Sequence, residues 1–247
     1  MEFVGNIKAI AKREMVSYVE SPVAYVFAVV FLMLIGFLTF FVSRFYENGQ
    51  ADLRPFFFWH PWMFLILVPA AAMRLWAEER RTGTIETLLT LPITMTEAIL
   101  GKFLAAWLFL AVVILLTFPV ALTTAYLGAP DKGAMIGGYV GSILLAGSYL
   151  AVGMLTSALT RNQVISFVLS VMICLFLLLA GWPPVTDMLV HWAPEWMVSV
   201  VAAFSVMPHF EAFQKGVLDL RDFAYYFSLI AFMLFGTYLV LNNRKSA

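Results

Sequence analysis

Six intervals of at least 19 residues contain no Asp, Glu, Lys or Arg, and this spacing of charges most limits what the chain can fold into. A helix rises about 1.5 Å per residue, so about 20 apolar residues cross a hydrocarbon core of about 30 Å. The chain is also 62% hydrophobic, which leaves too little polar surface to cover a soluble domain. The sequence therefore predicts an all-α integral membrane protein. The charge-free intervals are 21–43, 55–73, 103–130, 133–160, 162–186 and 223–243.

These intervals predict six transmembrane helices in a single domain that covers residues 1–247. A further charge-free interval, 196–210, is only 15 residues long and contains Pro208, so we expect an interfacial or re-entrant segment there. It lies within residues 187–222, which we expect on the extracytoplasmic side. The predicted spans are 23–43, 56–76, 97–127, 134–160, 163–183 and 223–243.

The lysines and arginines are distributed unevenly between the two ends of the predicted helices. If the N terminus is cytoplasmic, six crossings place ten of the 15 basic residues in cytoplasmic segments, in agreement with the positive-inside rule. We therefore expect a multi-pass protein of the cell (inner or plasma) membrane with both termini in the cytoplasm. The basic residues expected inside are Lys8, Lys12, Arg13, Arg74, Arg80, Arg81, Lys102, Arg161, Arg244 and Lys245. Those expected outside are Arg44, Arg54, Lys132, Lys215 and Arg221.

Residues 1–20 precede the first span and show helical periodicity. Apolar residues from Val4 to Tyr18 recur three or four positions apart, while Lys8 and Lys12 fall on the opposite side. This pattern predicts an amphipathic helix that lies on the inner leaflet. A frayed cytoplasmic tail is the alternative.

Prolines and small residues predict breaks and close contacts within the helices. Ser21-Pro22 should end the N-terminal helix, Pro119 should kink or end the third span, and Pro183-Pro184 should kink or end the fifth. In the fourth span, small residues repeat every four positions, which lets helix backbones approach closely. Packing inside one bundle and a subunit interface are both compatible with this pattern. The two rows are Gly133, Gly137 and Gly141, and Gly138, Ser142 and Ala146.

Five charges within nine residues stand between the second and third spans, in the stretch EERRTGTIETLLTLP that runs from Glu78 to Pro92. Gly83 should interrupt the helix that leaves the second span. Thr84 can cap a new short helix, which must end before Pro92. Glu86 lies near the positive end of this short helix and should stabilise it.

The predicted short helix has an apolar face, formed by Ile85, Leu88 and Leu89. The following Thr94 and Glu97 fit a capping box at the start of the third span. An apolar helix face at the membrane surface either rests on lipid or docks into a groove of a cytoplasmic partner. The residues alone leave both uses open.

The string from Glu78 to Leu89, followed by Pro92 and Gly101-Lys102, resembles the signature of ABC type-2 permeases, the membrane subunits of one class of ATP-driven exporters. The opening AKREMVSYVESPVAYVFAVVFLMLIGFLTF and the closing HFEAFQKGVLDLRDFAYYFSL are similar to the branch named after gliding-motility ABC permeases. This resemblance covers essentially the full length. It implies a type V exporter-like fold, in which the charged segment forms a coupling helix that seats in a nucleotide-binding subunit.

The resemblance also implies the partners and cofactors. ABC ATPase subunits would bind the ATP and Mg²⁺, and this chain would hold no cofactor or metal of its own. A second copy of the chain or a related permease would complete the complex in membrane lipid; the net charge of zero gives no sign of nucleic-acid binding. The residues that would couple to the ATPase are Glu78, Glu79, Arg80, Gly83, Thr84, Ile85, Glu86, Leu88, Leu89 and Pro92.

No G-x-x-x-x-G-K-[ST] motif occurs in the sequence, so we expect the ATPase activity to reside in another chain. The spans also lack paired carboxylates and a histidine cluster with metal-ligand spacing, which disfavours an intramembrane enzyme. A membrane scaffold that recruits a different cytoplasmic partner is the main alternative to a permease. His60, His191 and His209 all map to the outer side, where a copper site is conceivable, although such residues more often only pack.

Overall fold

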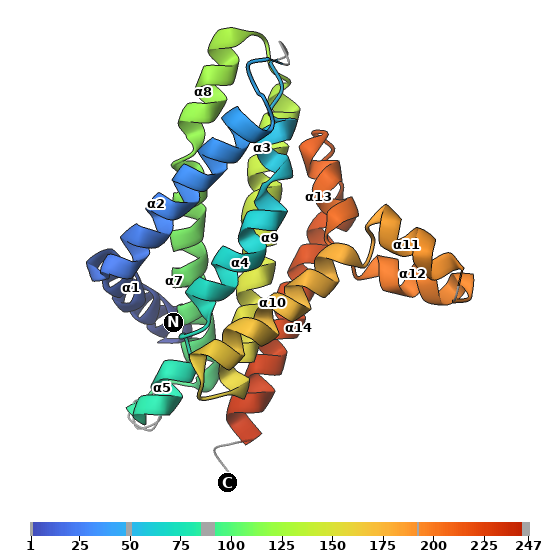
Figure 1. Cartoon of the computed structure of the whole chain (residues 1–247). Helices are drawn as coiled ribbons and strands as arrows, with labels where there is room; N and C mark the ends of the chain where they lie inside the picture. Colours follow the sequence, from blue (N-terminus) through green and yellow to red (C-terminus); the bar gives the residue numbers. More distant parts are fainter. Residues whose placement is uncertain (1, 48–50, 85–91, 192, 244–247) are drawn as a thin grey trace.

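The computed structural model describes residues 2–47, 51–84, 92–191 and 193–243, and the regular secondary structure of these residues is helical (Figure 1). The first half contains α1 (Glu2–Glu20), α2 (Pro22–Phe37) with a π-helical extension η1 (Leu38–Val42), α3 (Arg54–Phe58), α4 (His60–Ala72), α5 (Ala77–Thr82) and α7 (Met95–Leu115). The second half contains α8 (Phe118–Leu127), α9 (Lys132–Leu159), α10 (Gln163–Leu179), α11 (Pro183–Val190), α12 (Glu195–Ala203), α13 (Met207–Gln214) and α14 (Leu220–Asn243). Figure 1 shows an elongated bundle, from which α11 and α12 project to one side.

Helix α9 forms the centre of the bundle and contacts α4, α7, α10, α13 and α14. In the most apolar 18-residue stretch of α9, 83% of the residues are buried, whereas in the corresponding stretch of α2 with η1 only 17% are buried. The outer helices keep large apolar side chains at the surface, among them Met33, Phe41 and Phe232. A buried helix surrounded by helices with apolar outer faces fits a bilayer, because lipid rather than water surrounds the bundle.

The small residues of α9 are sites of close contact within this chain. A Cβ atom at Gly137 or Gly141 would collide with Phe213 of α13, and one at Gly138 would collide with the ring of Phe57. A Cβ atom at Gly147 would lie 2.7 Å from Trp107 Nε1 of α7. Of the two uses left open by the sequence, the structure therefore supports packing inside one bundle.

We expect Gly138→Ala to lower the free energy of unfolding by about 1–3 kcal/mol, because the new methyl group overpacks the contact with Phe57. Gly36→Ala is the matched control, since no atom lies within 4 Å of a Cβ placed at that helical position. The control should be neutral or gain up to about 1 kcal/mol from helix propensity. Thermal unfolding of both variants in the same detergent measures the difference. Equal midpoints for the two variants would contradict the close contact.

Among the described residues, four helical segments are long and apolar enough to cross a membrane by length and composition. They are Pro22–Val42, Met95–Leu127, Lys132–Leu159 and Leu220–Asn243. A fifth is possible only if α12 and α13, which are bent by 57° at their junction, form one broken span. The bend is compatible with a broken span and with a re-entrant loop, so the interfacial or re-entrant segment expected at 196–210 stays a prediction. The chain is therefore a multi-pass membrane protein.

The two remaining predicted spans are shorter in the structure than the sequence indicated. The span predicted over 56–76 is divided into α3 and α4, and helix α4 ends at Ala72 instead of continuing to residue 76. Pro61 has no N–H group, so it cannot continue the hydrogen-bond ladder from α3, and it occupies the first turn of α4. The span predicted over 163–183 is α10, which is only 17 residues long because it ends before Gly181.

Several predicted breaks are confirmed. Helix α1 ends at Glu20, directly before Ser21-Pro22, and α7 ends at Leu115, so that Pro119 lies in the first turn of α8. Pro183 begins the separate helix α11. Thr94 and Glu97 form the predicted capping box, in which each side chain bonds the backbone N–H of the other residue.

The N-terminal helix has the predicted extent, but it packs on α7. Tyr18 stacks on Phe109 with ring centroids 5.2 Å apart, and Ile10 is buried against Gly101. The repeating apolar positions, which the sequence assigned to contact with lipid, thus face protein for much of their length. Phe3 and Val4 at the start of the helix are about half exposed.

Candidate functional site

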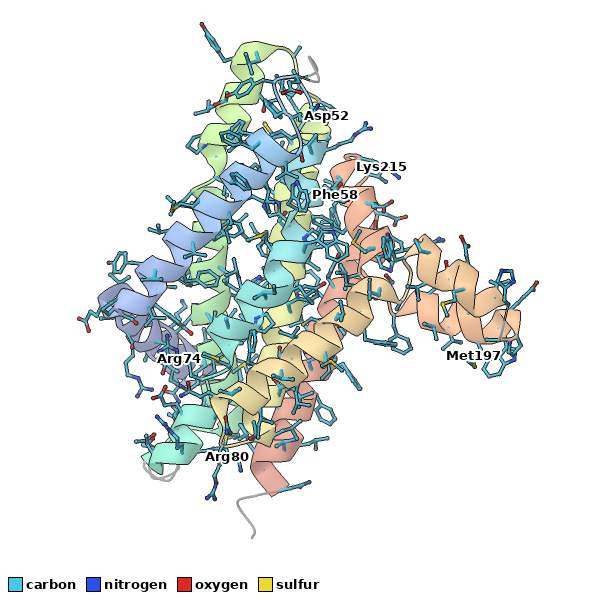
Figure 2. The ribbon with its side chains drawn as sticks, in the orientation of Figure 1. Asp52, Phe58, Arg74, Arg80, Met197 and Lys215 are labelled. Atoms are coloured by element: carbon cyan, nitrogen blue, oxygen red, sulfur yellow. The ribbon has the colours of Figure 1, made fainter. Side chains whose placement is uncertain are left out.

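Helix α5 carries the first part of the charged segment and lies at one end of the bundle. Figure 2 labels Arg74 and Arg80 at this end, whereas Asp52 and Lys215 lie at the opposite end. Gly83 ends α5 in the left-handed conformation, with φ of 76°, which confirms the predicted interruption. The sequence also predicted continuous helix up to this point, but a turn separates the end of α4 from α5.

Ser157 of α9 holds this turn in place. Its hydroxyl oxygen accepts hydrogen bonds from the backbone N–H groups of Trp76 and Ala77, both at 2.9 Å, and the hydroxyl donates to the carbonyl of Met73 at 3.0 Å. The first N–H groups of a helix have no partner within the helix. Ser157 supplies that partner from a distant helix, so it performs the role that an N-cap residue performs locally.

Arg80 fixes the middle of α5 to the same helix. Its guanidinium donates to the carbonyl oxygen of Ala158, in the last turn of α9. Carbonyl groups at the C-terminal end of a helix lack intrahelical partners and carry partial negative charge, which favours a cation there. Helix α5 is therefore attached to the end of α9 through both its backbone and a side chain.

Lys102 of α7 makes the third attachment. Its side chain is only 4% exposed, and its Nζ lies 2.7 Å from Glu79 of α5 and 3.1 Å from Glu14 of α1. The ammonium group also lies 5.4 Å from the centre of the Trp76 ring. A buried ammonium is stable only when it is paired, so these contacts require α1, α5 and α7 to stay together. We call Glu14, Glu79, Arg80, Lys102 and Ser157 the α5 anchor.

The electrostatics of Glu14 reflect this pairing. Burial alone would raise the pKa of its carboxyl group, but Lys102 and Arg13 together hold that pKa below its usual value. The carboxylate form is therefore the form that the folded protein stabilises. Because the pKa is depressed, the contribution to stability is present above the unfolded pKa of about 4.3 and is lost as the pH falls through the folded value.

Close approach of α1 to α7 brings Glu14 within reach of Lys102. A Cβ atom at Gly101 would lie 2.6 Å from a side-chain atom of Ile10, so only glycine fits at this position without a shift. Glu97, which lies one turn before Gly101 in α7, accepts a hydrogen bond of 3.1 Å from Asn6 of α1. Gly101 thus lets α1 approach α7 closely, and Lys102 forms an ion pair with Glu14 across this contact.

The predicted coupling residues fall into three groups. Glu79 and Arg80 belong to the α5 anchor, whereas the side chain of Glu78 pairs, among the described residues, only with exposed Arg81 at 3.5 Å. Thr84 lies beyond the glycine, where its hydroxyl is 3.0 Å from that of Thr82, and Pro92 is exposed. The remaining predicted residues lie outside the described residues, so the short helix and its apolar face stay a prediction. They are Ile85, Glu86, Leu88 and Leu89.

Three members of the α5 anchor were absent from the predicted site. Of these three residues, only Lys102 could have been singled out from the sequence. It is a lysine directly before a 28-residue charge-free interval and within the apolar start of α7. Ser157 lies in a helix with several other small residues and Glu14 in a charged one, so neither residue stands out.

The three histidines occupy three separate environments. His60 is fully buried among phenylalanine rings, and His191 is exposed at the end of α11. His209 of α13 stacks on Tyr225 and lies 2.6 Å from Asp222 of α14. Within the described residues, no three His, Cys, Asp or Glu side chains form a group that could hold a metal ion.

Comparison with known proteins gives one informative match. Residues 8–234 match the family described as ABC-2 family transporter protein. The search of curated proteins gives no match. The family match covers most of the chain and agrees with its long apolar helices, while nothing in it separates the gliding-motility branch from the rest of the family. The chain therefore belongs to the ABC-2 family of transporter proteins, in which it is a membrane-spanning permease subunit of an ABC transporter.

Proposed function

We propose that this permease works in an exporter, in which the segment from Glu78 to Pro92 binds an ABC ATPase and α5 transmits the motion of that ATPase to the membrane helices. The ATPase subunits would bind ATP and Mg²⁺ and carry out the hydrolysis. Two copies of the chain, or one copy and a related permease, would enclose the transport pathway. Family resemblance supports the direction of transport, which would be export.

The observation that carries this proposal is the α5 anchor. Any force applied to the segment that follows Gly83 acts on a helix that is joined to α9 by Ser157 and Arg80, and to α7 and α1 by Lys102. Because α9 is the centre of the bundle, displacement of α5 would alter the packing of the whole permease. By linkage, a ligand that changes this packing would also change the affinity of the ATPase for nucleotide.

The proposal includes the orientation in the membrane. Helix α14 ends at the same end of the bundle as α5, and α1 lies beside the first half of α7, near that end (Figure 1). Together with the uneven distribution of basic residues, this favours an even number of crossings, with α5 and both termini in the cytoplasm. Six crossings would use α3 with α4 and α10 as the two shorter spans, and the membrane would be the inner or plasma membrane.

A membrane scaffold is the competing function, and purification of the tagged chain from its own membranes distinguishes the two. We expect an accompanying chain that contains G-x-x-x-x-G-K-[ST]. The isolated permease should not hydrolyse ATP, and adding it to the partner should change the partner's hydrolysis rate. A partner whose phosphate-loop lysine is replaced is the control for contaminating activity. Hydrolysis by the verified single chain, or a stable partner without a phosphate loop, would contradict the proposal.

A further inference from the structure

A cavity of about 490 Å³ lies beside the α5 anchor, between the end of α1, the start of α2 and the end of α4. The first turns of α2 form one wall, with Val26, Phe27 and Val30, and Leu67 of α4 lies across from them. Val26 is 61% exposed and Val30 is 38% exposed, so this wall is open to the surface of the bundle. The volume is within the usual range for pockets that bind small molecules, about 300–1,000 Å³.

The lining of the cavity changes from apolar to charged along its length. At the end toward α5 it is lined by Arg74, Glu78 and Glu79, together with Lys102 and Glu14. Most of the apolar wall belongs to α2, which is part of a segment long and apolar enough to cross a membrane, whereas the charged end lies where α4 gives way to α5. A ligand that matches this lining has one charged end and an apolar body that continues into the bilayer.

Arg74 is the basic group that remains available in this cavity. Lys102 is already paired with two carboxylates, but the Arg74 guanidinium has neither an ion pair nor a hydrogen bond to another described residue. Arg74 is half-buried, and Figure 2 labels it close to α1 at the α5 end of the bundle. An arginine in this position can bind a phosphate through two parallel hydrogen bonds.

The cavity also offers acceptors beside Arg74. The Oε2 atom of Glu79 is buried and has no hydrogen-bond partner in the described part of the chain, and Glu78 is held only by its long contact with Arg81. The lining contains three carboxylates and two basic groups, so it repels a headgroup with net negative charge. A headgroup that carries a primary ammonium next to its phosphate satisfies both the arginine and the carboxylates.

We propose that this cavity binds a phospholipid with a primary amine headgroup, of the phosphatidylethanolamine type, from the leaflet on the α5 side. The phosphate binds Arg74, the ammonium donates to Glu79 and Glu78, and one acyl chain lies along Val26 and Leu67. Such a lipid joins α2 and α4 to α5 at the point where the charged segment begins. The inference does not depend on the proposed function, since it concerns a lipid that the single chain holds.

The test is a titration of the delipidated, detergent-solubilised chain with phosphatidylethanolamine, phosphatidylglycerol and phosphatidylcholine of identical acyl chains, followed by native mass spectrometry. We expect one tightly bound phosphatidylethanolamine, and about tenfold or more weaker binding of the other two lipids. Arg74→Gln should weaken the binding of phosphatidylethanolamine by about tenfold. Phosphatidylethanolamine should also raise the Tm of the wild type but not that of Arg74→Gln.

Two further variants separate the cavity from general lipid contact. Arg161→Gln removes an exposed arginine that lies between α9 and α10, outside the cavity, and it should bind phosphatidylethanolamine as the wild type does. Ala70→Phe fills the apolar part without changing any charge and should also weaken binding. Equal binding of the three lipids, tighter binding of phosphatidylglycerol, or unchanged binding by Arg74→Gln would overturn the proposal.

Discussion

Replacing Lys102 by methionine should loosen the attachment of α5 to α1 and α7 and lower the free energy of unfolding by about 3 kcal/mol. The substitution leaves two carboxylates, Glu14 and Glu79, without the ammonium that pairs with both. Breaking a buried ion pair on one side costs about 3–5 kcal/mol. The lower end applies here, because the side chains of the two acids remain 17% and 21% exposed and can recover some hydration.

The weaker attachment of α5 can be measured by limited trypsin digestion at Arg80 and Arg81. Cleavage requires local opening, and a loss of about 3 kcal/mol corresponds to roughly a hundredfold larger open population. Lys12→Met, on the exposed side of α1, is the control and should leave cleavage unchanged. The triple variant with Lys102→Met, Glu14→Gln and Glu79→Gln should recover most of the stability, because the charges are removed together. If the Lys102→Met variant were cleaved at the same rate as the wild type, the ion pairs would not be what holds α5.

The second large effect is expected at Leu88, which lies outside the described residues. If Ile85, Leu88 and Leu89 fill a groove of the ATPase, each buried leucine contributes about 1.5–3 kcal/mol. Leu88→Asp should therefore weaken association with the ATPase by about tenfold or more. Glu86→Ala should have a smaller effect, since a charge near a helix end contributes only about 0.3–1 kcal/mol.

Recovery of the ATPase with tagged permease, at matched membrane levels, measures this effect. Leu218→Asp introduces the same change at an exposed position, near Lys215 at the opposite end of the bundle, and should bind the ATPase normally. If the leucine face instead rests on lipid, Leu88→Asp should lower the amount of inserted protein while the ATPase still binds. Unchanged recovery of the ATPase with Asp at position 88 would remove the docking role.

Local rules predicted most of the helix boundaries. The end of α1 before Pro22, the left-handed Gly83, the capping box of Thr94 and Glu97, and the break near Pro119 all occur where the sequence placed them. Each depends on atoms within about four residues, because backbone hydrogen bonds and proline sterics act over that distance. Such features can be read without knowledge of the fold.

The contacts of the candidate site could not be predicted in this way. Ser157 caps a helix that begins 80 residues earlier in the chain, and Glu14 reaches Lys102 across 88 residues. A serine and a glutamate are common residues, and nothing in their neighbourhoods distinguishes a buried partner from a solvated one. Their roles exist only after α1, α7 and α9 have packed together.

The sequence by itself determined that this chain is a helical membrane protein, where most of its helices begin and end, and that a charged segment interrupts them. These properties follow from the length of the apolar intervals and from backbone chemistry, which are local. Only the tertiary structure decided that α9 is the buried centre, that its glycines serve contacts within one chain, and that Lys102 joins three helices. In an almost uniformly apolar sequence, hydrophobicity does not tell which face meets protein and which meets lipid, because both are equally apolar surroundings. Close packing and the pairing of the few buried charges decide that choice.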